Sequence, residues 1–342
     1  HLSAMKEYDV IVQSLDHVAS LLDARGLKNP IVVTDENVAF HAEKIVASLN
    51  GIGFKTNVLT IPAGEEYKNL NTVSFLWKLF LEHGLDRRST VIAVGGGVIS
   101  DAAGFAASTY MRGISWVVVP TTLLSMVDAS LGGKTGIDLP EGKNLIGSFY
   151  PPKLVLADPN LLKTLPEAEL ISGLAEVVKH GIISDPELFN LCARGLDCVK
   201  EELEQIVRRA MAVKIRIIEE DPYEKDIRAA LNLGHTVGHA VELVSKFQLR
   251  HGEAIAIGMV AEARYAEQIG IASKGLAESI AEVLSTLGLP VQIPNELSRE
   301  EILRAMKVDK KKNAQAIRFA LPAEIGKVEL VDVTNLEEVI DF

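Results

Sequence analysis

The sequence has few cysteines and gives no indication of a disulfide. Only two cysteines, Cys192 and Cys198, occur in 342 residues. They lie six positions apart, which is neither the three nor the four that places two side chains on one face of a helix. We therefore expect two free thiols in a reducing compartment, and hence a cytoplasmic protein.

Long apolar runs and an excess of positive charge are also absent. The longest apolar run, Trp116 to Met126, is broken by Pro120, Thr121 and Thr122, so we expect no membrane span. The net charge of −11 argues against a nucleic-acid binder, because phosphate backbones attract clustered Lys and Arg. No signal peptide is visible. These absences predict a cytoplasmic protein without nucleic-acid or membrane partners.

What is present describes a globular protein of two domains. Apolar residues make up 48% of the chain and charged residues 24%, which is typical of soluble folded proteins. A chain of 342 residues is too long for one ordinary core. Pro151 and Pro152 mark a boundary, and the pattern changes after Leu165-Pro166. We therefore expect one domain at 1–165 and a second at 166–342.

The first half alternates β-branched runs with amphipathic stretches. This alternation predicts a mostly parallel sheet with helices on its faces, in which ligands bind beyond the carboxyl ends of the strands. The expected strands are 8–13, 31–34, 55–61, 90–94 and 115–119, and the expected helices are 16–25, 42–49, 71–83 and 101–110.

Three glycines, Gly95 to Gly97, directly follow one of these strands. A backbone without side chains can approach a pyrophosphate closely, and the next helix would point its N-terminus at it. The dinucleotide fingerprint G-x-G-x-x-G is not matched, because Ser100 and Asp101 follow. A plain tight turn would also explain the glycines. The segment is a candidate phosphate-binding turn.

A second glycine-rich stretch, 126–147, carries Lys134 and Lys143. Its Gly-Gly-Lys-Thr resembles the end of a P-loop, but the first glycine that a P-loop requires is absent, so we reject an ATP site. Flexible backbone with two lysines suits a phosphate or a carboxylate in an acidic protein. Solvated surface lysines are the alternative.

The second half is predicted to be helical almost throughout, without an internal repeat or a low-complexity segment. This favours a mainly α-helical second domain, with a ligand cleft between the two domains. The expected helices are 167–182, 186–194, 200–218, 237–247, 254–269, 274–287 and 298–308.

Three of the eight histidines, His235, His239 and His251, fall within seventeen positions. On a helix His235 and His239 share one face, the spacing at which two imidazoles can hold one metal ion or one ligand. His251 follows in Arg-His-Gly-Glu, where a turn could bring it back to the pair. Hydrogen-bonded core histidines are the alternative.

Other polar residues of this half also suggest chemistry. Glu176 and Lys179 lie three apart on an otherwise apolar helix, where a carboxylate needs a cation; an intrahelical ion pair would also explain them. Arg228 and Asn232 precede His235, and Lys214 lies in a similar helix. The basic run 309–313 is either a solvated face or part of a site.

Together these motifs resemble those of the 3-dehydroquinate synthases, from Asp35 to about Pro322. The matching segments, in the family's order, are Gly64-Glu-Glu-Tyr-Lys68, Gly95-Gly-Gly-Val-Ile-Ser-Asp101, Pro120-Thr-Thr-Leu-Leu, Asp128-Ala-Ser-Leu-Gly-Gly-Lys134, Gly142-Lys-Asn-Leu-Ile-Gly147, Leu174-Ala-Glu-Val-Val-Lys-His-Gly181, Leu231-Asn-Leu-Gly-His-Thr-Val-Gly-His239 and Arg250-His-Gly-Glu253. The resemblance implies an N-terminal Rossmann-like α/β domain that binds NAD. It also implies a mainly α-helical C-terminal domain that binds substrate and a divalent metal, zinc or cobalt.

The resemblance further assigns roles residue by residue. Glu176, His235 and His251 would ligate the metal, so that His239 contacts the substrate instead. NAD would contact Asp35, Asn37, Glu65, Lys68, Gly96, Gly97, Val98, Asp101, Thr121, Thr122, Lys134, Lys143 and Thr164. The substrate would lie among Asp128, Lys134, Asn144, Lys179, Lys214, Arg228, Asn232, His239 and one of Lys310 and Lys311. In a homodimer, Arg112 would reach the phosphate in the other subunit's site.

The implied activity converts the sugar phosphate 3-deoxy-D-arabino-heptulosonate 7-phosphate to 3-dehydroquinate and phosphate, a step of the shikimate pathway. Transient oxidation by NAD, β-elimination of phosphate, re-reduction and an intramolecular aldol closure would leave NAD unchanged. The alternatives are a metal-dependent alcohol or glycerol dehydrogenase, a related sugar-phosphate cyclase with another substrate, and an inactive sensor. Ser100 departs from the family's usual glycine and adds a side chain near the candidate phosphate-binding turn.

Overall fold

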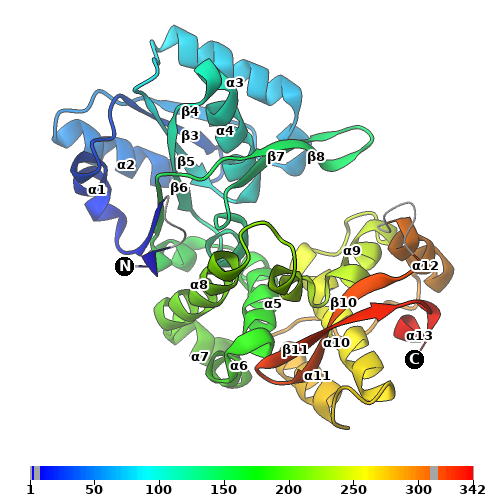
Figure 1. Ribbon diagram of the computed structural model, residues 1–342. Helices are drawn as coiled ribbons and strands as arrows, with labels where there is room; N and C mark the ends of the chain where they lie inside the picture. The colour runs from blue at the N-terminus through cyan, green and yellow to red at the C-terminus, as the bar shows by residue number, and fades with distance from the viewer. Residues whose placement is uncertain (1, 4–7, 309–314, 342) are drawn as a thin grey trace. The chain divides into compact units, whose positions relative to one another are not determined.

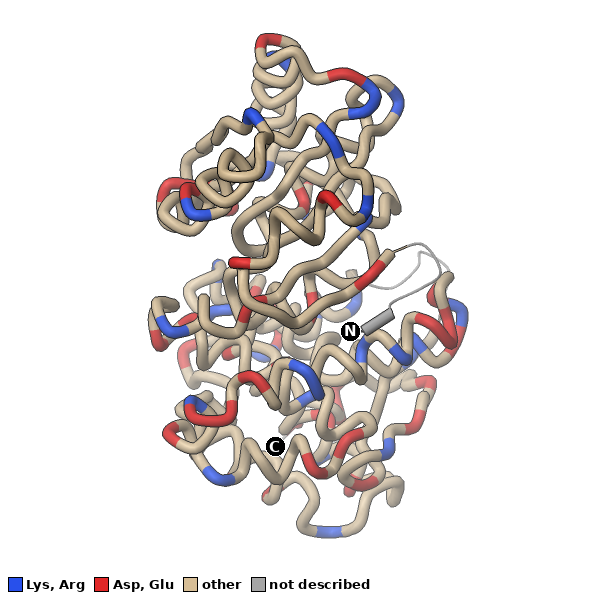
Figure 2. The backbone as a smooth tube through the Cα atoms, turned by 90° about the vertical axis from the view of Figure 1, so that its left-hand side faces the viewer, with Lys and Arg blue, Asp and Glu red and all other residues tan. Residues whose placement is uncertain are grey.

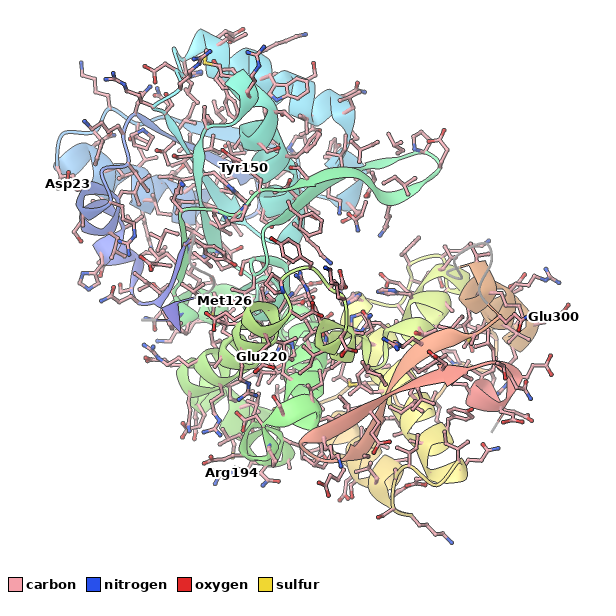
Figure 3. All side chains as sticks on the ribbon, viewed as in Figure 1. Asp23, Met126, Tyr150, Arg194, Glu220 and Glu300 are labelled. Carbon is pink, nitrogen blue, oxygen red and sulfur yellow. The ribbon has the colours of Figure 1, made fainter. Side chains whose placement is uncertain are left out.

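The structure is a computed structural model that describes residues 2–3, 8–308 and 315–341 (Figure 1). The chain divides into two compact units, His1–Leu165 and Pro166–Phe342. Within each unit, side chains fill the space between the helices and strands (Figure 3). Each unit has its own set of buried apolar side chains, as expected for two separate cores.

The first unit is built on a seven-stranded sheet in the order β1-β2-β9-β6-β5-β3-β4. All neighbours from β2 to β4 pair in parallel, and only β1 is antiparallel. The inner strands are rich in Val and Ile and are buried on both faces, which is typical of a parallel sheet covered by helices. The expected α/β fold is confirmed. The strands are β1 Leu2–Ser3, β2 Asp9–Val12, β3 Pro30–Asp35, β4 Val58–Ile61, β5 Thr90–Gly95, β6 Ser115–Pro120 and β9 Leu154–Ala157.

Four helices connect these strands: α1 Val18–Ala24, α2 Ala39–Gly51, α3 Leu70–Glu82 and α4 Gly97–Thr109. The expected helix 101–110 was placed too late, because α4 begins at Gly97. Glycine has a low helix propensity and conceals such a start in the sequence. The helix therefore opens within the glycine run, and its free N–H groups lie at the end of β5.

The direction of chain winding reverses at β3. This strand pairs with β4 on one side and with β5 on the other. In open α/β sheets the crevice at such a switch point, beyond the carboxyl ends of the strands, is where ligands bind. The two strand ends at this point are Asp35 and Gly95.

The stretch 126–147 was expected to be flexible backbone, and from Lys134 onward that expectation was wrong. It forms an antiparallel hairpin of β7 Lys134–Leu139 and β8 Gly142–Phe149. Gly136 faces Gly147 across the hairpin, and a Cβ on Gly147 would come within 2.2 Å of the Thr135 carbonyl oxygen. The two glycines therefore allow close strand approach, which is a common reason for glycine inside a strand.

The second unit is mainly α-helical, as expected. Its helices are α5 Glu167–Ser184, α6 Pro186–Ala193, α7 Leu196–Glu201, α8 Leu203–Glu220, α9 His235–Val244, α10 His251–Gln268, α11 Leu276–Thr286, α12 Arg299–Val308 and α13 Glu337–Ile340. Helix α10 packs against α5, α9 and α11 and is buried over almost its whole length. A helix that is apolar on all sides occupies the middle of a helical domain.

One β-hairpin of this unit was not predicted from the sequence; it is formed by β10 Ile317–Glu324 and β11 Lys327–Val333. Pro322 interrupts the alternating pattern of the first strand, and the pairing register shifts between Pro322 and Glu324. A proline at a bulge is compatible with a strand but hides it from pattern analysis.

Acidic and basic residues alternate along the tube of Figure 2, and no extended basic stripe appears in that view. In the part of the chain that the structure describes, no helix combines the length and the apolarity that a membrane crossing requires.

We predict that the two thiols differ sharply in reactivity. Both cysteines are free; Cys198 is exposed, whereas burial raises the pKa of the Cys192 thiol to about 12. Only the thiolate attacks a disulfide reagent, so Cys198 should react in the native protein and Cys192 only after unfolding. A thiol titration in buffer and in denaturant checks this, with Cys198→Ser as the control that should silence the native signal. Rapid native labelling of Cys192 would contradict it.

Candidate active site

Three side chains from three helices of the second unit converge on one point. Oε1 of Glu176, on α5, lies 2.9 Å from Nε2 of His251 and 3.2 Å from Nε2 of His235. His235 opens α9 and His251 opens α10. Glu176 is completely buried, so its carboxylate needs compensation from cations or hydrogen-bond donors.

The donor set fits a tetrahedral metal ion. Zinc binds imidazole nitrogen and carboxylate oxygen at about 2.0–2.2 Å, which separates tetrahedral ligand atoms by about 3.3–3.6 Å. The observed separations of 2.9 and 3.2 Å are slightly shorter, and the three ligand atoms lie within 4.8 Å of one another. Two imidazoles and one carboxylate leave a fourth position open, which is typical of a catalytic site and not of a structural one.

Both imidazoles are oriented for metal binding. Nδ1 of His235 lies 3.0 Å from the carbonyl oxygen of Leu233, which can only accept, so Nδ1 donates and Nε2 keeps its lone pair for a metal. Nδ1 of His251 lies 3.4 Å from a carboxylate oxygen of Glu242. A carboxylate or carbonyl behind each imidazole is the usual way in which proteins fix a ligating histidine.

His239 does not belong to this group of three. Its ring centroid lies 5.0 Å from that of His235, and its side chain is exposed. His239 instead forms a second group with Glu242 and His251. The i,i+4 spacing therefore does not place His235 and His239 in one ligand group, and Glu176 takes the position that the spacing suggested for His239.

The ion pair considered as an alternative for Glu176 is also present. Nζ of Lys179 lies 2.5 Å from Oε2 of Glu176, and both side chains are almost fully buried. Burial alone would raise the pKa of Glu176, but Lys179 and the two imidazoles hold it well below its usual range. Glu176 is therefore ionised, with one oxygen towards Lys179 and the other towards the histidines.

The remaining predicted residues of this unit lie on α8 and on the short helix η6, Ile227–Asn232. Nζ of Lys179 donates to the carbonyl oxygen of Leu231 (2.8 Å), which ties α5 to η6. Arg228 is buried and its guanidinium donates to the carbonyl oxygen of Pro222 (3.0 Å), whereas Asn232 is exposed. Lys214 on α8 is buried. Lys310 and Lys311 lie outside the described residues.

In the first unit, the glycine run and the residues after β3 and β6 meet at the switch point described above. A Cβ on Gly95 would come within 2.6 Å of Ile99, so packing explains this glycine. A Cβ on Gly96 or Gly97 would make only ordinary contacts, with Thr122 at 3.4 Å and Ala129 at 3.6 Å. Nor does a positive φ require glycine at these three positions. Neither packing nor backbone conformation therefore requires glycine at Gly96 and Gly97. This favours a ligand that approaches the backbone at these two positions.

Around this turn, Asp35 ends β3, and its carboxylate accepts from the backbone N–H of Asn37 (2.8 Å). Burial raises the pKa of Asp35. Thr121 and Thr122 follow β6, and Oγ1 of Thr122 accepts from the N–H of Ser125 (3.0 Å). These residues belong to strand ends that the sheet brings together.

Lys68 is the centre of a polar network beside α4. Its buried Nζ donates to Asn144 Oδ1 (2.8 Å) and pairs with Glu65 (3.1 Å) and Asp101 (3.2 Å). Asp138 lies 3.7 Å away. Burial lowers the pKa of Lys68, but these carboxylates outweigh it, and the net shift is upward. For Asp101 burial acts in the opposite direction and raises the pKa of the carboxyl to about 6, although Lys68 opposes this shift. Lys68 thus links β7–β8 to α4.

The other predicted residues of the first unit lie on several different elements. Lys143 lies 3.7 Å from Glu65, and Lys134 is exposed at the start of β7. Asp128 lies in the π-helical turn Ser125–Ala129. Val98 lies in the first turn of α4, and Oγ1 of Thr164 donates to the carbonyl of Leu161.

The departure at Ser100 is absorbed within α4. Its side chain is buried, and its hydroxyl donates to the carbonyl oxygen of Gly97 (3.1 Å). The serine therefore satisfies its own hydrogen bond one turn back along the helix, a common fate of a helical serine. The glycine turn keeps its open backbone.

Two family models match the chain: 3-dehydroquinate synthase N-terminal over residues 58–172, and 3-dehydroquinate synthase C-terminal over residues 173–312. The chain belongs to the 3-dehydroquinate synthase family. A 3-dehydroquinate synthase of Nostoc punctiforme is 46% identical over 313 residues, which is 89% of this chain and 86% of that protein. Membership of the family accounts for the order of the motifs along both units.

Solved structures of related synthases share the family's fold. A 2-deoxy-scyllo-inosose synthase complexed with carbaglucose-6-phosphate, NAD+ and Co2+ has a TM-score of 0.87 at 29% identity, covering 97% of this chain and 95% of that one. The 2-epi-5-epi-valiolone synthase of Streptomyces hygroscopicus with NAD+ and Zn2+ bound has a TM-score of 0.88 at 31% identity, covering 99% and 97%. The fold of the whole chain is therefore that of these synthases.

One residue of the second candidate metal-binding group was not predicted from the sequence. Glu242 contacts His251 and completes the second group with His239, yet it was not among the predicted site residues. A signal was present, because Glu242 follows His239 by three positions and therefore shares its helix face. A carboxylate that shares a helix face with His235 and His239 should be counted as a candidate metal ligand together with them.

We predict that metal binding releases a proton from this site. Burial lowers the pKa of His251, but hydrogen bonds to Glu176 and Glu242 outweigh it and raise that pKa to about 10 in the metal-free protein. A metal ion must therefore displace the proton on Nε2. Calorimetric titration with Zn2+ at about pH 8, in buffers of different ionisation enthalpy, should show a buffer-dependent heat equivalent to about one proton.

The raised pKa of His251 also stabilises the metal-free fold, in a way that depends on pH. A raised folded-state pKa gives stability that is fully present below the usual value of 6.5 and is lost as pH rises through about 10.

For the calorimetric titration, His239→Gln is the matched control, because it leaves His251 and both of its carboxylate partners in place. A binding heat that does not vary with the buffer would contradict the prediction.

Proposed function

We propose that this protein is a 3-dehydroquinate synthase, which converts 3-deoxy-D-arabino-heptulosonate 7-phosphate to 3-dehydroquinate and phosphate. The observation that carries the proposal is the convergence of Glu176, His235 and His251 in a chain of this family. A Lewis acid with a free coordination position would assist the oxidation of an alcohol with which this cyclisation begins, and Glu176, His235 and His251 would hold such an ion.

We further propose that the first unit binds NAD and that the second binds Zn2+ or Co2+. The open backbone at Gly96 and Gly97, the N-terminus of α4 and the carboxylate of Asp35 support the first assignment. When bound, these groups would supply hydride transfer and Lewis acidity; the chain itself binds, orients and moves protons. Lys143, Thr121, Thr122 and the network around Lys68 would position the nucleotide, together with Asn37, Glu65, Val98, Asp101, Lys134 and Thr164.

The chain's cations suit a substrate with a phosphate and a carboxylate. Lys179 and Arg228 hold their positions through backbone carbonyls, and Lys214 is buried, so these charges are fixed and desolvated. Fixed charges shielded from water stabilise anions more strongly than solvated ones do. Asn232 and His239 are exposed beside His235, and we assign them to the sugar hydroxyls, with His239 as the proton carrier. Asp128, Lys134, Asn144 and Lys310 or Lys311 complete the proposed substrate contacts.

The alternative functions differ in products. A metal-dependent alcohol dehydrogenase would accumulate NADH and would not need this set of fixed cations. A cyclase of another pathway would accept a sugar phosphate without a carboxylate. An inactive sensor would lack a metal ligand, whereas all three are present.

One assay tests the proposal. With the heptulosonate phosphate, catalytic NAD and Zn2+, the protein should release one phosphate per substrate without accumulating NADH. Glu176→Gln should lower kcat by about a thousandfold or more, because it removes a metal ligand and the charge that the site compensates. Glu169→Gln is the matched control: Glu169 lies on the same helix but pairs with Arg250 at the surface. Net NADH formation, or full activity in Glu176→Gln, would refute the assignment.

We also propose that the enzyme is a homodimer in which Arg112 completes the other subunit's site. Arg112 is exposed in a strained loop: Met111, Arg112 and Gly113 have φ values of 50°, 69° and 112°. Tyr150, labelled in Figure 3, braces this loop, since its hydroxyl donates to the carbonyl oxygen of Ile114 (2.8 Å). Strain that the surrounding structure maintains is often associated with function.

Mixing two inactive variants tests this shared site. Arg112→Ala and His251→Gln should each be inactive alone, and co-expression should restore about a quarter of wild-type activity, because half of the dimers would then hold one intact site. The control pair, His235→Gln with His251→Gln, should stay inactive, since every site then lacks a metal ligand. No recovery in the first mixture would place Arg112 outside the other subunit's site.

The two free cysteines support our further proposal that the enzyme works in the cytoplasm. Thiols remain reduced there, whereas secreted proteins usually pair them. The proposed substrate is also an intermediate of central biosynthesis, which takes place in that compartment.

A further inference from the structure

Helix α9, which carries His235 and His239, has no N-cap side chain of its own. Its N-cap residue is Gly234, held in the left-handed region with φ +77°, and no side chain of this segment caps the first turn. The first backbone N–H groups of a helix have no partner within the helix and need acceptors from elsewhere. At a buried helix start this need is a structural constraint.

The acceptor comes from another helix. Glu262, on α10, is completely buried, and its two carboxylate oxygens accept hydrogen bonds from the backbone N–H groups of Gly234 and Val237 (3.4 Å). The N–H of Thr236 also donates to this carboxylate. Among the residues that the structure describes, no Lys, Arg or His forms an ion pair with Glu262. The first turn of α9 is therefore its main polar environment.

Glycines bring the two helices close enough for this contact. A Cβ on Gly258 would come within 2.0 Å of the Gly234 carbonyl oxygen, and one on Gly238 within 3.0 Å of the Ala254 carbonyl oxygen. The backbones of α9 and α10 therefore approach closely at these glycines, and the side chains of Ile255 and Met259 pack against Gly238 and Gly234. Glu262 lies one turn beyond Gly258 on α10, which places it beside the start of α9.

This cap lies directly behind a proposed metal ligand. His235 is the first residue of α9, between the two N–H groups that Glu262 accepts from. Its imidazole is oriented by the carbonyl of Leu233, on the other side of Gly234. The position of the ring therefore depends on the same short segment that Glu262 holds.

We propose that Glu262 is a positioning residue for the metal site: it is the N-cap of α9, supplied by α10, and it fixes His235 towards Glu176 and His251. This inference rests on the proposed metal site. It predicts that loss of the cap loosens the first turn of α9 and weakens metal binding, although Glu262 does not touch the metal. Ligands must be held within fractions of an ångström for tight coordination.

The chain contains a matched control for such a cap. Glu267, also on α10, accepts from the backbone N–H groups of Gly275 (2.8 Å) and Ala277 (2.9 Å) at the start of α11. Gly275 is likewise a left-handed N-cap glycine, with φ +102°. Helix α11 carries no proposed site residue, so removal of this cap should affect stability alone.

The experiment compares Glu262→Met and Glu262→Gln with Glu267→Met. Co2+ affinity is measured for each protein together with the d–d absorption spectrum, which reports ligand geometry, and the Tm. We expect Glu262→Met to raise the Kd for Co2+ at least tenfold and to change the spectrum. Glu262→Gln, which keeps one acceptor, should recover part of both. Glu267→Met should lower the Tm but leave the Kd within twofold of wild type and the spectrum unchanged.

Wild-type affinity and spectrum in Glu262→Met would overturn the inference, and so would an equal effect in Glu267→Met. If Glu262→Met does not fold, Glu262→Gln decides, and an unchanged Kd and spectrum in that variant would overturn it. Failure of the wild-type protein to bind Co2+ is a different result, because it would reject the metal site itself and with it the proposed function.

Discussion

A single buried carboxylate organises the second unit. Glu176 lies without solvent contact on an otherwise apolar helix, and an isolated charge there would be strongly destabilising. Lys179 neutralises one oxygen, and the imidazoles of His235 and His251 approach the other. Because these partners come from α5, α9 and α10, satisfying one charge determines how three helices meet. The carboxylate of Glu176 therefore serves both the packing of these three helices and the proposed metal site.

In the first unit, the candidate binding turn is formed by backbone groups and not by a buried charge. The winding of the sheet reverses at β3, and in open α/β sheets ligands bind beyond the strand ends at such a point. Gly96 and Gly97 follow β5 there, and α4 begins at Gly97. The charged residues nearby, around Lys68, largely neutralise one another. Their arrangement fixes the hairpin β7–β8 against α4 through Asn144.

Much of this could be predicted from the sequence, for identifiable reasons. The parallel sheet and the helical second unit follow from strong local periodicity. The importance of Glu176 follows from a carboxylate in an apolar helix. The hairpin at Lys134–Phe149 could not be predicted in this way, because its glycines suggested flexibility, whereas they serve close strand contact with partners that local patterns do not reveal.

Tertiary geometry also decided what spacing could not. The i,i+4 relation of His235 and His239 is real, but Glu176, far away in the chain, takes the place that the relation suggested for His239. Glu262 illustrates the same limit, since nothing in the local sequence of α10 shows that it caps α9. Contacts between distant segments depend on packing, and a single sequence contains little direct information about packing.

The close approach of α9 and α10 at their glycines has a consequence for how such enzymes can diverge. Two backbones in contact cannot absorb added volume, so the sequence around Gly234, Gly238 and Gly258 has little freedom to vary. New substrate preferences must then arise elsewhere, on segments with room to change. The exposed residue Asn232, at the end of a short helix, is where we expect such adjustment of the sugar preference.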